Sequence, residues 1–248
     1  MTKVVLITGA SRGIGRATAR LAAALGWSVG INYSSNEAAA RETAALVESA
    51  GGRAHLLPGN VAEEPAVIAM FDECMRVFGR LDGFVNNAGI VAPGMPLADM
   101  DAARMKRIFD TNVYGAYLCA REAVRRMAKD RGGHGGAIVN LSSAAARLGA
   151  ANEYVDYAGS KAAIDTLTIG LSREIGPHGV RVNAVRPGLI DTEIHASGGR
   201  PDRAAVLGAQ TPLGRAGSAE EVAETIVWLL SDASSYVTGA IIDVTGGR

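Results

Sequence analysis

The sequence contains only two cysteines and four histidines among its 248 residues. Cys74 and Cys119 lie in different helical patterns, and neither has a CxxC partner or a histidine-rich stretch nearby. Structural zinc sites and redox-active disulfides need such clustered residues. The sequence therefore predicts two reduced, buried thiols, no disulfide and no metal site.

The sequence also lacks an excess of charge and any long hydrophobic run. Lysine and arginine together number 25, as do aspartate and glutamate, so the formal net charge is zero. This balance argues against nucleic acid as the main partner, because phosphate backbones are bound by basic surfaces. No apolar stretch approaches the length of a membrane span, and the apolar start is too short for a secretory signal. We expect a cytoplasmic protein that binds neither nucleic acid nor membranes.

Aromatic residues make up only 5% of the chain, whereas hydrophobic residues as a whole make up 48%. This composition argues against disorder and predicts a core of alanine, valine, leucine and isoleucine. Short β-branched runs, typical of strands buried on both faces, occur at residues 3–8, 28–33, 53–58, 82–87, 137–142, 180–185 and 240–244. Helical patterns lie between these runs, at residues 14–25, 36–50, 63–78, 99–129, 155–176 and 218–231.

Strands that alternate with helices pair in parallel through right-handed crossovers, which place helices on both faces of the sheet. No linker or low-complexity segment divides the chain. We therefore expect an α/β fold: one domain over residues 1–248, with a doubly wound, Rossmann-type parallel sheet of about seven strands. Residues 187–218 break the alternation with prolines, glycines and weak periodicity. Because loops of this length are usually functional, we expect a lid over a substrate pocket there.

A glycine-rich turn, "TGASRGIG" at residues 8–15, joins the first strand to the first helix. Gly9, Gly13 and Gly15 allow the backbone to bend sharply and to approach a pyrophosphate at the helix N-terminus. The spacing is G-x-x-x-G-x-G rather than the commoner G-x-G-x-x-G, so the strand before it and the helix after it support the assignment. We expect a dinucleotide site; the alternative is a tight turn that binds no ligand.

The end of the second strand, "NYSSNE", bears on which dinucleotide binds. In NAD enzymes a carboxylate about 20 residues beyond the glycines binds the ribose hydroxyls and repels a 2′-phosphate. Tyr33 stands at that distance from Gly13, and no acidic residue occurs between Ser28 and Asn36. Arg12 has no carboxylate near it in sequence and is suited to a phosphate. We expect NADP, with NAD as the alternative.

The stretch "EYVDYAGSK", residues 153–161, holds two tyrosines and a lysine. Residues four apart on a helix lie one above the other, about 6 Å along the axis. Tyr157 and Lys161 have this spacing, whereas Tyr154 lies seven residues from Lys161. A neighbouring ammonium favours the phenolate, so we expect Lys161 and an oxidised nicotinamide to lower the phenol pKa from about 10 toward about 7. Tyr157 is the predicted general acid and base, and Tyr154 a pocket wall or core residue.

Hydride transfer to a carbonyl also needs a hydrogen bond to the developing alkoxide. The stretch "IVNLSS" ends the fifth strand with Ser142 and Ser143, at the edge of the sheet where such folds bind ligands. Ser143 is nearer the rim and is the candidate, whereas Ser142 is expected to cap a turn. Asn112 lies in the middle of a helical pattern, where asparagine is unfavourable. We expect its amide to hold a water molecule beside Lys161.

Taken in this order, the motifs resemble those of the short-chain dehydrogenase/reductase family over essentially the whole chain. They are "TGASRGIG" (8–15), "NNAG" (86–89), "TN" (111–112), "SS" (142–143), "YAGSK" (157–161) and "RPG" (186–188). The resemblance implies a catalytic group of Asn112, Ser143, Tyr157 and Lys161. It implies cofactor contacts from Gly9, Ser11, Arg12, Gly13, Ile14, Gly15, Tyr33, Ser34, Asn60, Val61, Asn87, Ala88, Gly89, Tyr157, Lys161, Pro187, Gly188, Ile190 and Thr192.

Two positions depart from the family pattern. Asn60 stands where relatives usually have an aspartate that contacts adenine, and asparagine can still donate and accept hydrogen bonds. Ser143 and Tyr157 are 14 residues apart, one more than in many relatives. We expect the extra residue to bulge into the loop between them.

The resemblance implies an NADP-dependent oxidoreductase that moves hydride between nicotinamide and a carbonyl or secondary alcohol, with Tyr157 as general acid and base. It is most similar to the glucose 1-dehydrogenase and 3-oxoacyl-carrier-protein reductase branches, so a 3-oxoacyl-thioester reductase is one alternative to a sugar or alcohol dehydrogenase. A non-catalytic NADP-binding redox sensor is another, and the intact Ser-Tyr-Lys-Asn set argues against it. The last strand, in "YVTGAIIDVTGG" (236–247), resembles one that helps relatives to form homotetramers.

The substrate pocket is predicted from the segments around the two tyrosines and the expected lid. This set offers no obvious anchor for a carboxylate or a phosphate. We expect His195 to be solvated rather than in contact with substrate. The candidates are Leu148, Ala150, Glu153, Tyr154, Asp191, Glu193 and His195.

Overall fold

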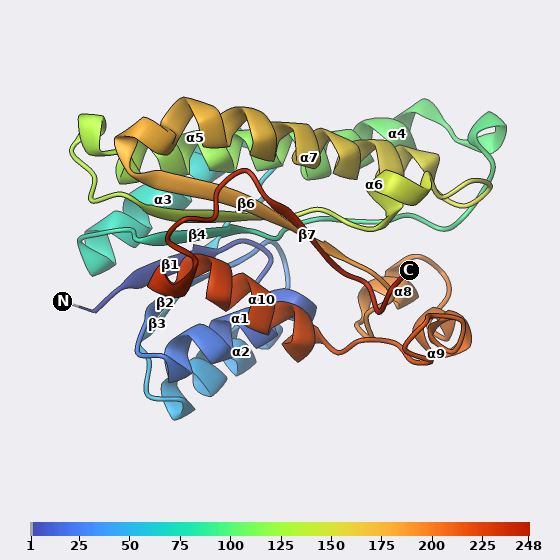
Figure 1. Ribbon diagram of the computed structural model, residues 1–248, viewed down its shortest axis with the longest axis horizontal. Coiled ribbons are helices and arrows are strands. Elements are labelled where there is room, and N and C mark those ends of the chain that lie inside the picture. Colours follow the sequence, from blue (N-terminus) through green and yellow to red (C-terminus); the bar gives the residue numbers. More distant parts are fainter. Residues whose placement is uncertain (1) are drawn as a thin grey trace.

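Seven strands form one sheet in the computed structural model, which describes residues 2–248 apart from the side chain of His195 (Figure 1). All neighbouring strands are parallel, in the order β3-β2-β1-β4-β5-β6-β7. The order reverses between β1 and β4, so a crevice opens at the carboxyl ends of these two strands. The strands are β1 (Val4–Ile7), β2 (Ser28–Tyr33), β3 (Ala54–Pro58), β4 (Gly83–Asn86), β5 (Gly136–Leu141), β6 (Val180–Pro187) and β7 (Ile241–Val244).

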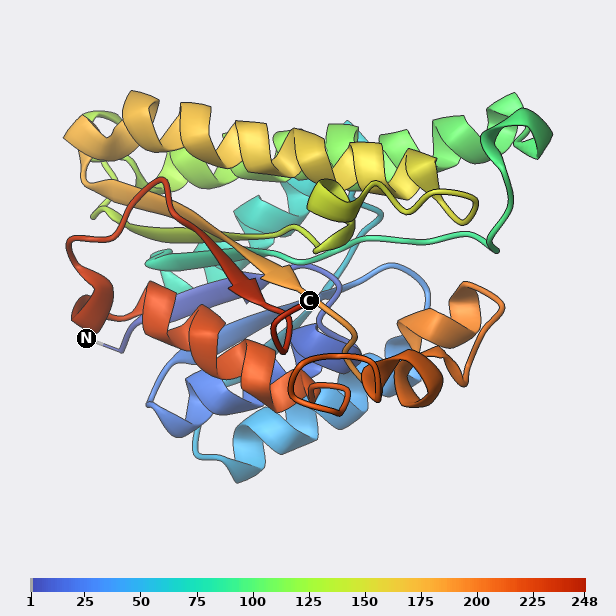
Figure 2. The same ribbon diagram turned by 45° about the vertical axis from the view of Figure 1, so that its right-hand side comes forward.

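Helices cover both faces of this sheet, as Figures 1 and 2 show. One apolar cluster joins the sheet to α1, α2 and α10, and a second joins it to α3, α5 and α7. The strands are therefore buried on both faces, which accounts for their valine, leucine and isoleucine content. The helices are α1 (Gly13–Ala24), α2 (Glu37–Ser49), α3 (Glu64–Phe78), α4 (Ala102–Phe109), α5 (Ala116–Met127), α6 (Ala145–Leu148), α7 (Val155–Ile175), α8 (Ile194–Ser197), α9 (Arg203–Gly208) and α10 (Ala219–Leu230).

The α/β fold predicted from the sequence, with seven parallel strands and helices on both faces, is confirmed. The segment expected to be a lid contains two short helices, α8 and α9, which lie beyond the carboxyl ends of the strands (Figure 2). Short 3-10 turns lie at Leu97–Asp99, Lys129–Arg131, Gly176–His178 and Asp232–Ser234. Among the described residues, no helix combines the length and the apolar character needed to cross a membrane.

The helical pattern predicted over residues 99–129 is found as a continuous helical stretch from Ala102 to Met127, but this stretch is not one regular α-helix. The segment is instead α4, a π-helix over Asp110–Gly115, and α5. The side chain of Asn112 turns to the backbone of Ile90, and Gly115 packs against Val61, where a Cβ atom would lie 2.8 Å from the Val61 carbonyl oxygen. These two tertiary contacts favour a local widening of the helix, which periodicity in the sequence does not reveal.

Buried side-chain amides hold α5 and α7 to the sheet. Asn86 and Asn140 are register partners on β4 and β5, and the Asn86 amide donates to the Asn140 side-chain oxygen at 3.1 Å. Asn86 also donates to the Ala116 carbonyl on α5 at 2.9 Å, and Asn140 donates to the Thr168 hydroxyl on α7 at 2.9 Å. Because buried amides lose free energy when unpaired, these bonds fix α5 and α7 at one position over the sheet.

Candidate active site

The glycine turn after β1 is compact because its backbone leaves no room for side chains. Gly9 and Gly13 have φ values of +61° and +54°, in the left-handed region that favours glycine. At Gly15 a Cβ atom would lie 2.6 Å from the Gly9 carbonyl oxygen. The Asn87 amide donates to the carbonyl oxygens of Thr8 at 2.7 Å and Gly9 at 3.0 Å. The turn and the "NNAG" segment are thus brought together, as the motifs predicted.

Two residues that the sequence analysis missed hold this turn in place. Asn32, buried in β2, accepts from the Gly9 amide at 3.2 Å and donates to the carbonyls of Leu57 and Gly59, each at 3.0 Å. Directly after β1, the Thr8 hydroxyl accepts from the backbone amides of Asn87 and Ala88. An asparagine within the otherwise apolar run "VGINY" was the signal that could have revealed Asn32, because buried amides require partners.

The arginine expected to bind a phosphate is exposed and free. Arg12 precedes the first turn of α1, and its side chain makes no hydrogen bond or ion pair with any described residue. Arg16, one turn further along, instead donates to the Ser11 carbonyl at 2.8 Å and to Glu42 at 2.9 Å. Arg12 is therefore available to an anion, whereas Arg16 braces the turn against α2.

At the end of β2 the structure departs from the expectation. The Tyr33 side chain packs in the core cluster with α1 and α2 and is only 9% exposed. Its neighbour Ser34 is exposed. The side chain that can face a ligand at this strand end is therefore that of Ser34.

One cavity of about 210 Å³ joins the predicted cofactor and catalytic residues. It lies at the carboxyl edge of the sheet, where doubly wound folds bind ligands. Gly13 does not line the cavity but lies next to Thr192, which does; a Cβ atom on Gly13 would lie 3.5 Å from the Thr192 methyl group. The predicted residues that line the cavity are Ile14, Asn87, Gly89, Ser143, Tyr157, Lys161, Pro187, Gly188, Ile190 and Thr192.

Other predicted cofactor residues do not line the cavity. Asn60 has local hydrogen bonds, from its amide to Glu63 at 3.0 Å and from the Ala62 amide to its side-chain oxygen at 3.1 Å. Val61 is buried against the π-helix. The set absent from the lining, among the described residues, is Gly9, Ser11, Arg12, Gly13, Gly15, Tyr33, Ser34, Asn60, Val61, Asn112 and Ala88.

Ser143 and Tyr157 meet inside the cavity. Ser143 follows β5, and its hydroxyl accepts from the Ala145 amide at 3.1 Å. The same hydroxyl lies close enough to the Tyr157 phenol to act toward lowering the pKa of that phenol. Ser142 points the other way, and its hydroxyl donates to the main-chain carbonyl of Lys161 at 3.1 Å. The segment between the two catalytic candidates contains α6 and a turn in which Ala150 and Asn152 have positive φ values of 48° and 59°.

Tyr157 lies in the first turn of α7, and a buried ion pair fixes this turn. Arg104 on α4 contacts Asp156 with 2.9 Å between Nε and Oδ2, and both side chains are almost fully buried. The other carboxylate oxygen of Asp156 accepts from the Tyr157 amide at 2.9 Å. Breaking such a buried pair leaves an uncompensated charge, so α4 and the start of α7 are held as one unit.

Lys161 is buried beneath Tyr157. Its ammonium group donates to the Leu141 carbonyl at 2.8 Å and lies 5.7 Å from the centroid of the Tyr157 ring. Burial lowers the pKa of Lys161 from 10.5 to about 8, and the nearby charge of Asp165 partly opposes this shift.

The expected lowering of the Tyr157 pKa is not found in the protein chain by itself. Burial raises the pKa of Tyr157 to about 12, and the Ser143 hydroxyl only partly opposes the rise. The physical reason is that desolvation disfavours the phenolate, while Lys161 lies over the ring and donates to a backbone carbonyl. Tyr157 is therefore a protonated phenol at neutral pH.

Asn112 fixes the loop after β4 rather than opening toward the cavity. Its side-chain oxygen accepts from the Ile90 amide at 2.8 Å, and its amide donates to the Ile90 carbonyl at 2.9 Å and the Ser160 hydroxyl at 3.1 Å. Both hydrogens of the Asn112 amide therefore have acceptors, and only one lone pair of its side-chain oxygen is left to accept a further hydrogen bond. A water-holding role for Asn112 stays a prediction.

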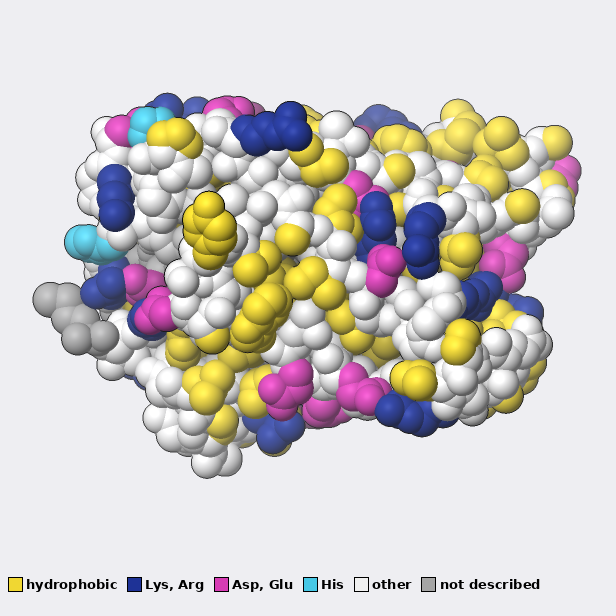
Figure 3. Space-filling model, viewed as in Figure 1, with side chains coloured by type: hydrophobic (Ala, Val, Ile, Leu, Met, Phe, Trp, Pro, Cys, Tyr) yellow, Lys and Arg dark blue, Asp and Glu magenta, His cyan; other side chains and the backbone are white. Residues whose placement is uncertain are grey.

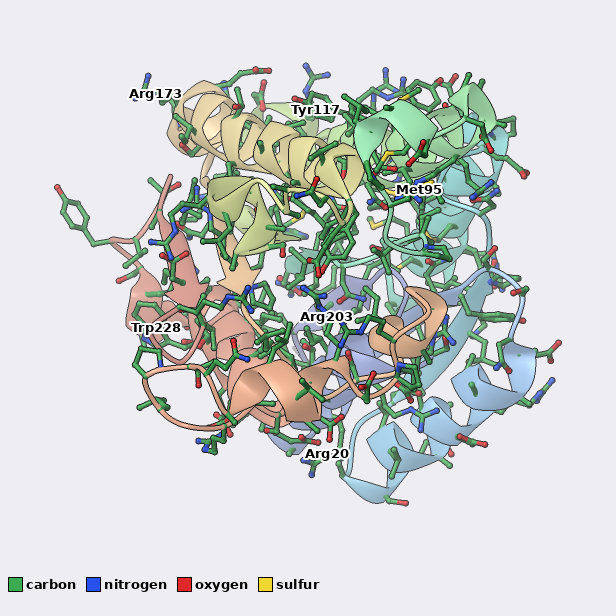
Figure 4. The ribbon with its side chains drawn as sticks, turned by 90° about the vertical axis from the view of Figure 1, so that its right-hand side faces the viewer. Arg20, Met95, Tyr117, Arg173, Arg203 and Trp228 are labelled. Atoms are coloured by element: carbon green, nitrogen blue, oxygen red, sulfur yellow. The ribbon has the colours of Figure 1, made fainter. Side chains whose placement is uncertain are left out.

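The wall of the cavity contains Tyr154, as expected. Its ring packs edge to face on Tyr157, with centroids 5.7 Å apart and planes at 89°. The guanidinium carbon of Arg203, on α9, lies 5.2 Å from the centroid of the Tyr154 ring. Arg203 also forms a bidentate ion pair with Glu153. Figure 4 shows Arg203 in the middle of this face of the molecule, next to the lid helices.

The remaining substrate candidates divide between two places. Leu148, Ala150 and Glu153 line the cavity, but Asp191 and Glu193 line a separate groove beside α1 and α10. The expectation for His195 falls on a side chain outside the described part of the structure. The sequence analysis missed the arginines of the cavity, Arg200, Arg203 and Arg248, because no motif marks them.

The fold and the site define a dinucleotide-dependent oxidoreductase. The glycine turn offers the close backbone approach that a dinucleotide needs, and a buried phenol, a hydroxyl and an ammonium meet at the other end. A family model described as "Enoyl-(Acyl carrier protein) reductase" matches residues 9–248. The chain belongs to the short-chain dehydrogenase/reductase family and is an oxidoreductase.

Similar proteins cover the whole chain. It is 53% identical to the "Uncharacterized oxidoreductase YgfF" of Escherichia coli, over 99% of both chains. It is 40% identical to the "L-rhamnose 1-dehydrogenase (NAD(P)(+))" of Sphingomonas sp., over 99% of this chain and 95% of that protein. A short-chain dehydrogenase/reductase mutant from Serratia marcescens has a similar structure, with a TM-score of 0.90, 32% identity, and coverage of 99% and 97%.

The pKa of Lys161 leads to a stability prediction. Because the folded chain has a pKa of about 8 and the unfolded chain one near 10.5, the unfolded state binds more protons between these values. The contribution of Lys161 to stability should therefore rise with pH in this window, by about 2 kcal/mol between pH 7 and pH 10. Cys74 and Cys119 act in the opposite direction, because burial raises the pKa of each thiol to about 12, so the quantity of interest is the difference between wild type and variant. Lys161→Met removes the titrating group and should remove this rise. Urea unfolding at each pH measures both proteins, and parallel curves for the two would contradict the prediction.

Proposed function

We propose that the protein transfers a hydride between NADP and a carbonyl or secondary alcohol, with Tyr157 as general acid and base. The placement of Ser143, Tyr157 and Lys161 together in one cavity is the observation that best supports this function. The nicotinamide, when bound, supplies or accepts the hydride. The backbone of the glycine turn, at Gly9, Gly13 and Gly15, would hold the pyrophosphate of the dinucleotide.

The side chains of the cavity transfer the proton and stabilise the charge on the substrate oxygen. In reduction, the neutral Tyr157 phenol donates its proton to the carbonyl oxygen, and the Ser143 hydroxyl donates a hydrogen bond to the same oxygen. In oxidation the steps reverse, and Tyr157 takes the alcohol proton. The Lys161 ammonium, 5.7 Å from the phenol ring centroid, favours the phenolate that reduction leaves behind. The apolar surroundings exclude water and strengthen each of these interactions.

The cavity also supports a role for the lid segment. Residues 187–218 contribute Leu189 and Ile190 near the sheet, and Ile194 and Arg203 further out. The ion pair of Arg203 and Glu153 holds this segment against the wall that carries Tyr154. We propose that residues 187–218 cover bound substrate and select it by shape and charge.

Two alternatives remain open to experiment. A 3-oxoacyl-thioester reductase is supported by the 36% identity over 247 residues to the "3-oxoacyl-[acyl-carrier-protein] reductase FabG" of Staphylococcus aureus. A redox sensor without turnover would not need a phenol, a hydroxyl and an ammonium together in one cavity, so the geometry argues against it. The reduced nicotinamide absorbance, followed over a panel of sugars, cyclic alcohols, ketones and 3-oxoacyl thioesters, separates the three functions.

The two tyrosines give a direct test. Tyr157→Phe removes the proton donor and should lower kcat by about a hundredfold to ten-thousandfold, while dinucleotide binding is retained. Tyr154→Phe removes a hydroxyl that bonds to Glu153 in the cavity wall and should change turnover by less than about tenfold. Steady-state kinetics with circular dichroism as a folding control measures both. Equal loss in the two variants would reverse the assignment of roles.

The free guanidinium of Arg12 supports NADP over NAD. A hydrogen bond to a charged group contributes about 1.5–3 kcal/mol, so NADP should be preferred by roughly tenfold to a hundred-and-fifty-fold in kcat/KM. Arg12→Ala should reduce this ratio toward unity, and Ser34→Asp should also lower it by repelling the 2′-phosphate. Tyr33→Asp is a poorer test, because that side chain lies in the core. Arg20→Ala is the matched control. A wild-type preference for NAD would refute the argument.

We also propose a cytoplasmic homotetramer. The two cysteines are free and buried, in keeping with a reducing compartment. Hydrophobic side chains gather near α4 at the upper right of Figure 3, and Phe109 and Tyr117 are each more than 40% exposed. Next to Phe109, α7 presents the exposed Gly159, which permits close helix packing. Sedimentation equilibrium should give about four times 25.6 kDa, and Gly159→Arg should lower it; a wild-type monomer would exclude this assembly.

A further inference from the structure

Three arginines line the cavity that holds Tyr157: Arg200, Arg203 and Arg248. Glu153 is the one acidic residue in the described part of the lining. The three arginines come from distant parts of the sequence, which is why inspection of the sequence found no anchor for an anion. The cavity therefore has an excess of positive charge in its outer wall.

Arg203 is already neutralised. Its two terminal nitrogens lie 2.6 Å and 2.8 Å from the two carboxylate oxygens of Glu153, and its side chain is nearly buried. The Tyr154 hydroxyl also bonds to Glu153. This group is satisfied by its own members, so Arg203 serves as part of the wall. The excess charge consists of Arg200 and Arg248.

Arg248 presents a guanidinium that no described residue pairs with. Its main-chain oxygen accepts from the Arg147 side chain at 2.8 Å, which holds the residue beside the cavity. The guanidinium itself makes no hydrogen bond or ion pair with the described residues. Burial raises the pKa of Tyr154, and the charges of Arg203 and Arg248 act against that rise. Arg248 therefore lies close enough to the Tyr154 wall to act on a group bound there.

Arg200 is nearly as free. Its one ion contact is with Asp202, at 3.9 Å between Nε and Oδ1, and both side chains are at least half exposed. Such a pair at the surface contributes little. The hydrogen bonds from Arg203 lower the pKa of Glu153, and the charge of Arg200 adds to this effect. Figure 3 shows arginine and lysine side chains near the C-terminal end of the chain, with an acidic side chain among them.

We propose that the substrate carries a carboxylate, which Arg248 and Arg200 bind at the outer end of the cavity. Guanidinium groups bind carboxylates through paired hydrogen bonds. Glu153 is the one acid in the described lining, and the contact of Arg200 with Asp202 is long and exposed, so both arginines are available to a ligand. The same cavity is also lined by Val91, Leu148 and Ile194, which suits an apolar body. The proposal rests on the proposed function for the reacting end of the same molecule.

Binding of small probes tests the anion site without any turnover. Calorimetry should give a dissociation constant for cyclohexanecarboxylate at least about tenfold lower than that for cyclohexanecarboxamide, because only the acid can pair with the arginines. Arg248→Gln and Arg200→Gln should each weaken the carboxylate by a similar factor and leave the carboxamide unchanged. Arg20→Gln, an exposed arginine far from Arg203 in Figure 4, is the matched control. Equal binding of the probes, or binding of neither, would overturn the proposal.

Kinetics then separates this proposal from the proposed function. With 4-oxocyclohexanecarboxylate and its methyl ester as substrates, Arg248→Gln should raise KM for the acid about tenfold with kcat unchanged, and leave the ester unaffected. If both ketones are reduced equally well by the wild type, the carboxylate site is wrong and the oxidoreductase function stands. If the probes bind as expected but no carbonyl compound is reduced, the anion site stands and the proposed function fails.

Discussion

The bond between the Lys161 ammonium and the Leu141 carbonyl is the interaction on which the site depends. An ammonium group removed from water needs a partner, and the last carbonyl of β5 provides one at 2.8 Å. The Ser142 hydroxyl adds a second link, to the Lys161 carbonyl. These two bonds fix α7 against the end of β5. Tyr157, one turn before Lys161, is thereby held where Ser143 meets it, so the position of a buried charge determines the position of the proton donor.

Much of the fold followed from local patterns in the sequence. Each strand is a short apolar run, and the spacing of Tyr157 and Lys161 was enough to place both on one helix face. Long-range contacts explain the failures. The π-helix depends on Ile90 and Val61, the position of Tyr33 on packing against two helices, and the direction of the Tyr157 pKa shift on burial. None of these is encoded near the residue it affects.

The charges of the cavity show the same limitation. Glu153 was predicted to line the pocket, but its partner Arg203 lies 50 residues further along the chain. From the sequence alone, Glu153 has no identifiable basic partner, and the cavity arginines have no identifiable function. The folded chain shows a satisfied pair, an Arg248 guanidinium that no described residue pairs with, and an Arg200 guanidinium with one long contact to Asp202. This difference changes the chemistry expected of the substrate. Charge complementarity across a cavity therefore requires the tertiary structure, whereas helical and strand periodicity does not.

The π-helix over Asp110–Gly115 also changes the phase of the helix that contains it. An α-helix turns by about 100° per residue, and a π turn accommodates roughly one extra residue. The faces of α4 and α5 are therefore rotated relative to those of an unbroken helix. This rotation lets α4 direct Arg104 to Asp156 while α5 directs Leu118 and its apolar neighbours into the core. Because the widened turn changes which residues face the core, one continuous stretch of chain can contact the active site through α4 and pack on the sheet through α5.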